Sequence, residues 1–107
     1  KVVTVDTGGE VALSGEVGNW PGVVSIQGFE LAKKFNEHVK SYGVEIDEGW
    51  KIEKITPVKK HYNLTAANGA GETKEIETKT IIIATGIHPR RLNVPGEDEL
   101  ERKGITY

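Results

Sequence analysis

The chain contains an acidic residue and two glycines directly after a strand-like run. Asp6 ends the β-branched run that begins at Val2, and Thr7-Gly8-Gly9-Glu10 follows it. An acid at the carboxyl end of a strand, before a glycine turn, can accept hydrogen bonds from a nucleotide ribose. Paired glycines let the backbone approach a ligand closely. The alternative interpretation is an ordinary turn that the Asp6 side chain stabilises.

A second candidate for ligand binding is Ala84-Thr85-Gly86, which follows an apolar run that begins at Thr80. In open α/β sheets, ligands bind beyond the carboxyl ends of the strands. The small residues would keep such a crevice open, and the Thr85 hydroxyl could donate a hydrogen bond there. A plain strand-to-loop turn is the alternative.

A third candidate is Gly18-Asn19-Trp20-Pro21-Gly22, in which glycines and a proline frame an amide and a flat aromatic ring. Such a loop would be rigid and could present both groups to a ligand. The alternative is that Trp20 covers the edge of the core, as large aromatic residues often do.

Several classes of function are not expected. The chain has 107 residues, which suffices for one domain, and its formal charge of −2 provides no chain-wide basic field for nucleic acid. No apolar run approaches the roughly 20 residues that a membrane helix needs. With no cysteine there is no disulfide, thiolate metal site or thiol nucleophile. The three histidines (His38, His61 and His88) are too scattered to suggest a metal site.

The periodicity of apolar residues predicts one main helix over Ile26 to Tyr42, with Ser25 as N-cap and Gly43 as the stop. The stretch between Asp6 and that helix is rich in Gly and Pro and is expected to be a long loop. Asn68-Gly69 predicts a hairpin turn. Strands are expected at Val2–Val5, Val44–Asp47, Trp50–Thr56, Tyr62–Ala66, Glu72–Glu77 and, buried on both faces, Thr80–Ala84.

Five motifs in this order resemble the flavin domain of low-molecular-weight thioredoxin reductases and of alkyl hydroperoxide reductase flavoproteins. They are Gly8-Gly9, Gly18-Asn19-Trp20-Pro21-Gly22, Gly28-Phe29-Glu30-Leu31, Ile81-Ile82-Ile83-Ala84-Thr85-Gly86 and Val94-Pro95-Gly96-Glu97. The resemblance implies an α/β fold: an incomplete Rossmann-like FAD-binding domain with parallel strands, one main helix and an antiparallel meander. It also implies electron transfer from NAD(P)H through FAD to a redox-active disulfide.

The resemblance places residues along the FAD molecule. Asp6, Thr7, Gly8, Gly9 and Glu10 would approach the ribose and pyrophosphate, and Asn19 the flavin. Lys51 and Ile52 would lie at the adenine edge, and Ala84, Thr85 and Gly86 beside the adenosine. No catalytic residue and no metal ligand is expected in this chain.

The family begins with a strand and a glycine-rich turn that are not found here, and its Cys-x-x-Cys pair would follow Tyr107. We therefore expect a fragment, with a partial FAD domain at 1–88 and a connection toward an NAD(P)H domain at 89–107. Alone it would be inactive and would not retain FAD. The parent would be a cytoplasmic homodimer that reduces a thioredoxin-like or peroxiredoxin-like protein. A non-catalytic protein-interaction module and a degenerate nucleotide-binding module are the alternatives.

Overall fold

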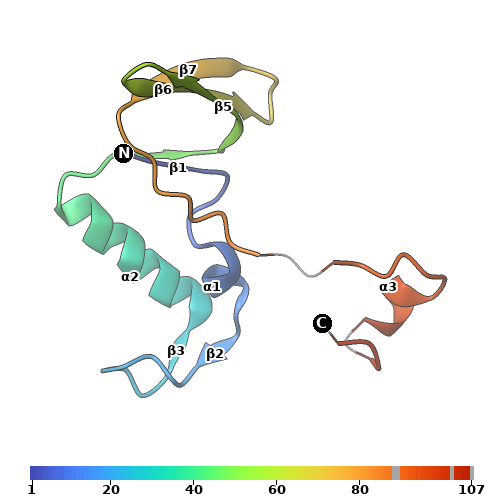
Figure 1. Ribbon diagram of the computed structural model, residues 1–107. Helices are drawn as coiled ribbons and strands as arrows, with labels where there is room; N and C mark the ends of the chain where they lie inside the picture. The colour runs from blue at the N-terminus through green and yellow to red at the C-terminus, as the bar shows by residue number, and fades with distance from the viewer. Residues whose placement is uncertain (88–89, 102, 107) are drawn as a thin grey trace.

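The computed structural model describes residues 1–87, 90–101 and 103–106. The chain forms a parallel strand pair, a helical layer below it, a three-stranded sheet above it and a short C-terminal unit to one side (Figure 1). In chain order the elements are β1 (Val2–Thr4), α1 (Gly9–Leu13), β2 (Glu16–Val17), β3 (Ile26–Gln27), α2 (Gly28–Ser41), β4 (Ile46–Glu48), β5 (Trp50–Val58), β6 (His61–Asn68), β7 (Thr73–Thr78) and α3 (Glu97–Leu100).

The parallel pair consists of β1 and β4, with Val2 opposite Ile46 and Thr4 opposite Glu48. Because the strands run in the same direction, both end at the same edge of the pair. The Gly49 amide donates to the Val5 carbonyl at 3.1 Å and continues the pairing past β4. On its other side, β1 pairs with no strand of the described chain.

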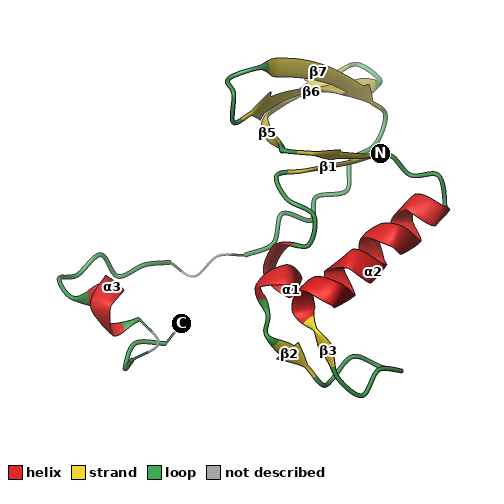
Figure 2. Cartoon of the chain, turned by 180° about the vertical axis from the view of Figure 1, so that it is seen from behind, coloured by secondary structure: helices red, strands yellow, loops and turns green. Residues whose placement is uncertain are grey.

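The helix α2 packs against the short helix α1 through small residues (Figure 2). Leu31 and Ala32 on α2 are each only 4% exposed. A Cβ on Gly28 would come within 2.2 Å of the Val11 carbonyl oxygen, and one on Gly8 within 2.9 Å of the Ala32 Cβ. The glycines therefore permit the close approach of these two helices.

The antiparallel sheet β5–β6–β7 confirms the predicted meander. Leu64 pairs with Ile55 on one side and Ile76 on the other, so the three side chains share one face of the sheet. Leu64 and Ala66 on β6 are buried. The predicted turn at Asn68-Gly69 is also confirmed, with the Gly71 amide donating to the Asn68 carbonyl at 3.1 Å.

The expectation of an unbroken loop up to Ser25 is wrong, since α1 and β2 lie within this stretch. The main helix begins at Gly28 rather than Ile26, and Gln27 rather than Ser25 occupies its N-cap position. The reason is that Ile26 pairs with Val17, so the residues before the helix are drawn into an antiparallel ladder. The Ser25 hydroxyl instead donates to Glu16 Oε1 at 2.5 Å.

The prediction of a buried strand at Thr80–Ala84 is also wrong. These residues form no strand, and Ile82 and Ile83 are 94% and 71% exposed. A strand requires a hydrogen-bonded neighbour, and none of the described strands pairs with this run. Thr80, Ile81 and Ile83 instead line an open hollow, together with Lys79 and with Ile55 and Tyr62 of the meander.

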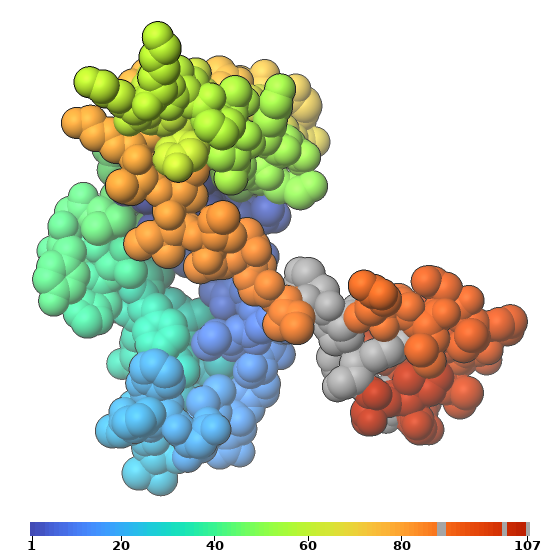
Figure 3. Space-filling view, in the orientation of Figure 1, coloured from blue at the N-terminus to red at the C-terminus, as the bar shows by residue number. Residues whose placement is uncertain are grey.

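The segment that contains α3 stands apart from the remainder of the chain, as the space-filling view shows (Figure 3). The expected boundary between residues 88 and 89 lies outside the described residues. None of the helices in the described chain is both long and apolar enough to span a membrane.

Candidate nucleotide-binding site

The shared carboxyl edge of β1 and β4 brings together acidic and hydroxyl side chains from distant parts of the sequence. The Thr7 amide, just past β1, donates to Glu48 Oε1 at the end of β4 at 2.9 Å. Asp6 precedes Thr7, so the segment that follows β1 carries a carboxylate and a hydroxyl at the edge where β4 ends in a second carboxylate. This is the position at which α/β sheets bind nucleotides.

Asp6 stabilises its own turn. Its Oδ1 accepts a hydrogen bond from the Gly9 amide at 2.8 Å, and its carbonyl accepts from the Thr4 hydroxyl at 2.6 Å. The bond from the Gly9 amide to Asp6 Oδ1 is the one expected of an aspartate that stabilises a turn. The Asp6 side chain is nevertheless exposed at the edge and carries a second carboxylate oxygen.

The Thr7 hydroxyl is buried and has no hydrogen-bond partner among the residues that the structure describes. A buried hydroxyl that lacks a partner costs roughly 1–3 kcal/mol. A ligand hydroxyl or amine at this edge could satisfy it. The carboxylates of Asp6 and Glu48 as acceptors, together with the Thr7 hydroxyl, suit the adenosine half of FAD, whose ribose offers hydroxyl groups.

Glu48 was not singled out from the sequence. The signal that could have identified it is its position, because an acid at the end of a neighbouring parallel strand lies at the same edge as the residues that follow β1. Finding it required the register in which Thr4 lies opposite Glu48.

The two glycines after Thr7 differ in their surroundings. Gly8 has a φ of +134°, and a Cβ there would lie 2.6 Å from the Ala12 Cβ, so Gly8 serves helix packing. Gly9 has open space around its Cβ position. Glu10 lies in the first turn of α1, where the amide dipoles favour a carboxylate.

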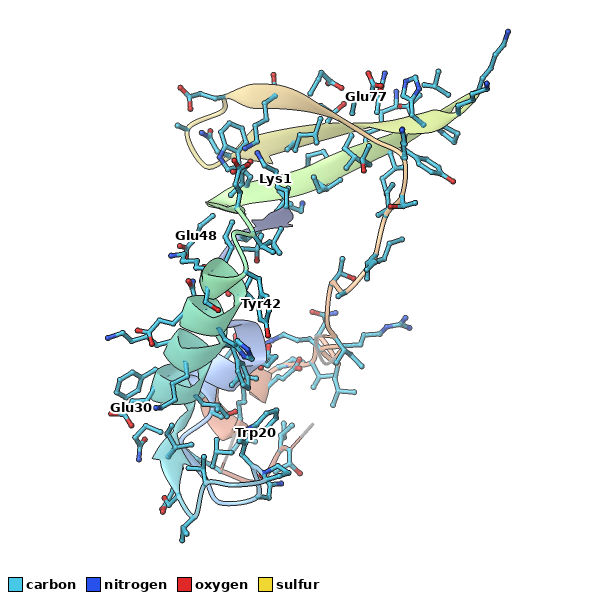
Figure 4. All side chains as sticks on the ribbon, turned by 90° about the vertical axis from the view of Figure 1, so that its left-hand side faces the viewer. Lys1, Trp20, Glu30, Tyr42, Glu48 and Glu77 are labelled. Atoms are coloured by element: carbon cyan, nitrogen blue, oxygen red, sulfur yellow. The ribbon has the colours of Figure 1, made fainter. Side chains whose placement is uncertain are left out.

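The loop with Asn19 and Trp20 lies near the start of α2, and Glu48 lies near the opposite end of that helix (Figure 4). The Trp20 ring packs edge-on against Phe35, with 5.0 Å between ring centroids. Trp20 remains 44% exposed and Asn19 is exposed. Trp20 thus covers one side of α2 and leaves part of its ring exposed, and its role toward a ligand stays a prediction.

The remaining expected FAD contacts are divided between a strand and the unpaired run. Lys51 and Ile52 belong to β5, shortly after Gly49, and Lys51 Nζ lies 3.0 Å from Glu53 Oε1. Ala84, Thr85 and Gly86 are exposed and belong to no sheet. No described strand pairing joins them to the edge of β1 and β4.

A charged cluster ties β1 and β4 to the meander. Asp47 Oδ2 accepts from Lys74 Nζ at 2.6 Å and from Lys1 Nζ at 3.2 Å. Hydrogen bonds from Lys74 first and Lys1 second lower the pKa of Asp47. Lys74 Nζ also lies 4.0 Å from the centroid of the Trp50 ring, a cation–π contact. Nothing in the sequence pattern indicated this cluster.

The described residues contain no group of three or more His, Asp or Glu side chains that could hold a metal ion. His38 contacts Tyr42 on α2, and His61 Nδ1 lies 3.9 Å from Glu77 Oε1, while His88 lies outside the described residues. Arg91 pairs with Asp98 and Glu101.

The sequence and the fold of this chain were compared with those of known proteins. The family described as pyridine nucleotide-disulphide oxidoreductase matches residues 2–107. The chain is 38% identical over 100 residues to a thioredoxin reductase of Bacillus subtilis. It is 44% identical over 105 residues to a thioredoxin reductase of Ureaplasma parvum. Each of these matches covers 94% of this chain and 30% of the relative. The crystal structure of Lactococcus lactis thioredoxin reductase matches with a TM-score of 0.77 and 32% identity, covering 92% of this chain and 31% of that one.

The parallel pair, the helix α2 and the meander define an α/β fold that matches the FAD-binding domain of thioredoxin reductases. The chain belongs to the pyridine nucleotide-disulphide oxidoreductase family. The resemblance to thioredoxin reductases is confirmed. The chain spans about 30% of the length of these relatives.

Proposed function

We propose that this chain is the part of a thioredoxin-reductase-like flavoprotein that holds the adenosine half of FAD. The carrying observation is the buried Thr7 hydroxyl without a described partner, next to Asp6 in the sequence and in a residue whose amide donates to Glu48. Asp6 and Glu48 would accept hydrogen bonds from ribose hydroxyls, and Thr7 would bond the same group. When bound, FAD would supply electron transfer between a nicotinamide and a disulfide.

In this proposal the other expected contacts follow the length of FAD. Lys51 and Ile52 would border the adenine, Ala84, Thr85 and Gly86 the adenosine, and Gly8, Gly9 and Glu10 the pyrophosphate. Asn19 would lie toward the flavin, at the far end of α2. The distance of this loop from Glu48 along α2 suits an elongated dinucleotide rather than a mononucleotide.

Two unpartnered features support a partial domain over residues 1–88. One edge of β1 pairs with no described strand, and the apolar run Ile81–Ala84 has no strand neighbour although its sequence is typical of a buried strand. A further parallel strand between them would give both a hydrogen-bonded partner. Its glycine-rich turn would supply the amides that hold a pyrophosphate.

The whole reductase would take electrons from NADH or NADPH and pass them to a thioredoxin-like or peroxiredoxin-like protein. We place it in the cytoplasm as a homodimer, with residues 89–107 leading toward the NAD(P)H domain. In this proposal no residue of the chain acts as a catalytic group. The chain alone is therefore expected to have no reductase activity and not to retain FAD.

A second candidate is a protein-interaction module, favoured by the open edge of β1. An exposed strand edge can accept a strand from a partner through main-chain hydrogen bonds. This function would need no nucleotide, so nucleotide binding discriminates between the two proposals.

The test is a titration of the chain with FAD, ADP and AMP, followed by flavin fluorescence and calorimetry. We expect weak binding of all three through the adenosine half, lost in the Thr7→Val variant and in Glu48→Gln. The matched control is Thr56→Val, which changes an exposed threonine on β5. Adding an N-terminal strand, glycine-rich turn and helix should convert weak FAD binding into tight, yellow, stoichiometric binding.

Absence of nucleotide binding in both the short and the extended chain would refute the flavoprotein proposal and favour the interaction module. Binding of ADP and AMP without any gain for FAD in the extended chain would favour a degenerate nucleotide-binding module. Tight FAD binding by the short chain would refute the claim that a glycine-rich turn is required.

A further inference from the structure

The C-terminal segment forms a unit closed by its own hydrogen bonds. We call residues 91–101 and 103–105 the clasp. Figures 1 and 2 both show it standing apart from α2 and from the meander. Its contacts are local: the Leu100 carbonyl accepts from the amides of Lys103 at 2.9 Å and Ile105 at 3.0 Å, and Glu101 bridges to Ile105.

The centre of the clasp is a buried carboxylate. Glu97 begins α3 and is only 4% exposed. Its Oε1 accepts from the Leu92 amide at 2.9 Å, and its Oε2 accepts from the Asn93 amide at 2.6 Å. One side chain thus satisfies two consecutive backbone donors that the turn leaves without a backbone acceptor. Bonds between a carboxylate and backbone amides are about twice as strong as neutral ones.

The backbone around this carboxylate takes an unusual course, which Glu97 holds in place. Asn93 has a φ of +56°, in the left-handed region that non-glycine residues seldom adopt, and Gly96 has a φ of +85°. These two residues reverse the chain so that Leu92 and Asn93 face α3. On the outside, Arg91 pairs with Asp98 and with Glu101, and these partners raise its pKa.

We propose that Glu97 is the latch of a rigid connector: its carboxylate locks the chain before α3 to the helix itself, so that the clasp behaves as one body. A connector of this kind would fix the orientation of residue 106 relative to residue 90. The claim that this connector joins two domains rests on the proposed function. Its rigidity does not, because all the bonds involved lie within the clasp.

The test compares Glu97→Gln with Glu99→Gln. Glutamine keeps the size of the side chain but replaces one acceptor oxygen by an NH₂ donor, so it cannot accept from both amides. Glu99 lies on the same helix, is exposed, and loses the same charge on substitution. In Glu97→Gln we expect the amides of Leu92 and Asn93 to exchange about 10- to 100-fold faster by NMR. In Glu99→Gln we expect no change.

The second measurement is a distance distribution between spin labels. Arg90→Cys places a label immediately before the clasp and Lys103→Cys places one within it, beyond α3, and the chain has no cysteine of its own to label. We expect one narrow distance in the parent chain and in Glu99→Gln, and a distribution at least about twofold broader in Glu97→Gln.

Equal exchange and equal widths in the two variants would overturn the proposal. It would also be overturned if Glu97→Gln loosened the amides of β5, β6 and β7, because the clasp would then not be a separate body. Neither result depends on nucleotide binding, so failure of the latch and failure of the flavoprotein proposal are distinguishable.

Discussion

Gly28→Ala is expected to destabilise the chain although it adds a single methyl group in a helix. The new Cβ would lie 2.2 Å from the Val11 carbonyl oxygen and 2.4 Å from that of Ser14. The shorter distance falls about 1 Å below an ordinary C···O contact. Both neighbours are backbone atoms, so no side-chain rotation relieves the clash, and α1 must move away from α2.

The size of the effect follows from two opposing terms. Overpacking that forces backbone movement typically costs about 1–3 kcal/mol. Alanine is favoured over glycine in a helix by up to about 1 kcal/mol, which offsets part of this cost. Because both clashes are with backbone oxygens, we expect the upper end of the overpacking range, about 3 kcal/mol, and hence a net loss of about 2 kcal/mol. With a urea m value of about 1–2 kcal/mol/M for a chain of this size, the midpoint should fall by about 1–2 M.

The assay is urea unfolding followed by tryptophan fluorescence, to which Trp20 reports directly because its ring contacts Phe35 on α2. The matched control is Gly15→Ala. The Cβ position of Gly15 meets nothing within 4 Å, and its carbonyl still accepts from the Gly28 amide at 2.9 Å. If Gly28→Ala and Gly15→Ala unfolded at the same urea concentration, the close approach of α1 and α2 would be refuted.

Three further predictions concern the meander and its charged cluster. Leu64→Ala should lower the free energy of unfolding by about 2–4 kcal/mol in urea, since Leu64 is only 8% exposed. Ile82→Ala, at a residue that is 94% exposed, should change it by less than about 0.5 kcal/mol. A comparable loss in both variants would place Ile82 in the core. Asn68→Ala should cost about 1–2 kcal/mol, because the Asn68 Oδ1 accepts from the amides of Ala70 at 3.1 Å and Glu72 at 2.9 Å. The control in the same thermal melts is Asn63→Ala, at a half-buried asparagine on the same strand. The lowered pKa of Asp47 means that its ion pairs contribute stability above pH about 4, and that this contribution is lost as the pH falls through the folded-state pKa. Asp47→Asn should therefore flatten the loss of stability between pH 5 and 2 in urea titrations at each pH, and an unchanged acid profile would contradict the role of Lys74 and Lys1.

The sequence determined those elements whose stability depends on their own periodicity. The spacing of Leu31, Phe35 and Val39 predicted α2, because residues three and four apart share one helix face. Alternation and the Asn68-Gly69 turn predicted the meander, because hairpin strands pair with their neighbours along the chain. Helix and hairpin contacts are local, so short windows of sequence contain the information they need.

Motif order also predicted the family, although no single motif was decisive. The glycine turn, the Trp20 loop and the run that ends at Gly86 lie in the order found in thioredoxin reductases. The confirmed matches with these proteins cover 94% of the chain or nearly so. The assignment of individual residues to FAD stays a prediction.

Other features were decided only by contacts between distant residues. Ile81–Ala84 has the sequence of a buried strand, yet without a hydrogen-bonded neighbour in the described chain it forms no strand, and Ile82 and Ile83 stay exposed. The helix α1 lacks a recognisable period in five residues and exists because Gly8 and Gly28 let it pack on α2. A strand edge or a helix contact is a property of two segments, and one segment alone does not encode it.

The candidate site shows the same division. Asp6 and the glycines were visible as types and spacing, because they are neighbours along the chain. Glu48 joined them only through the parallel register of β1 and β4, across more than forty residues, as the Thr7 amide bonds its carboxylate. The sequence determined which residues could do chemistry, and the tertiary structure decided which of them meet, because hydrogen bonds act over about 3 Å and chain order carries no such distances.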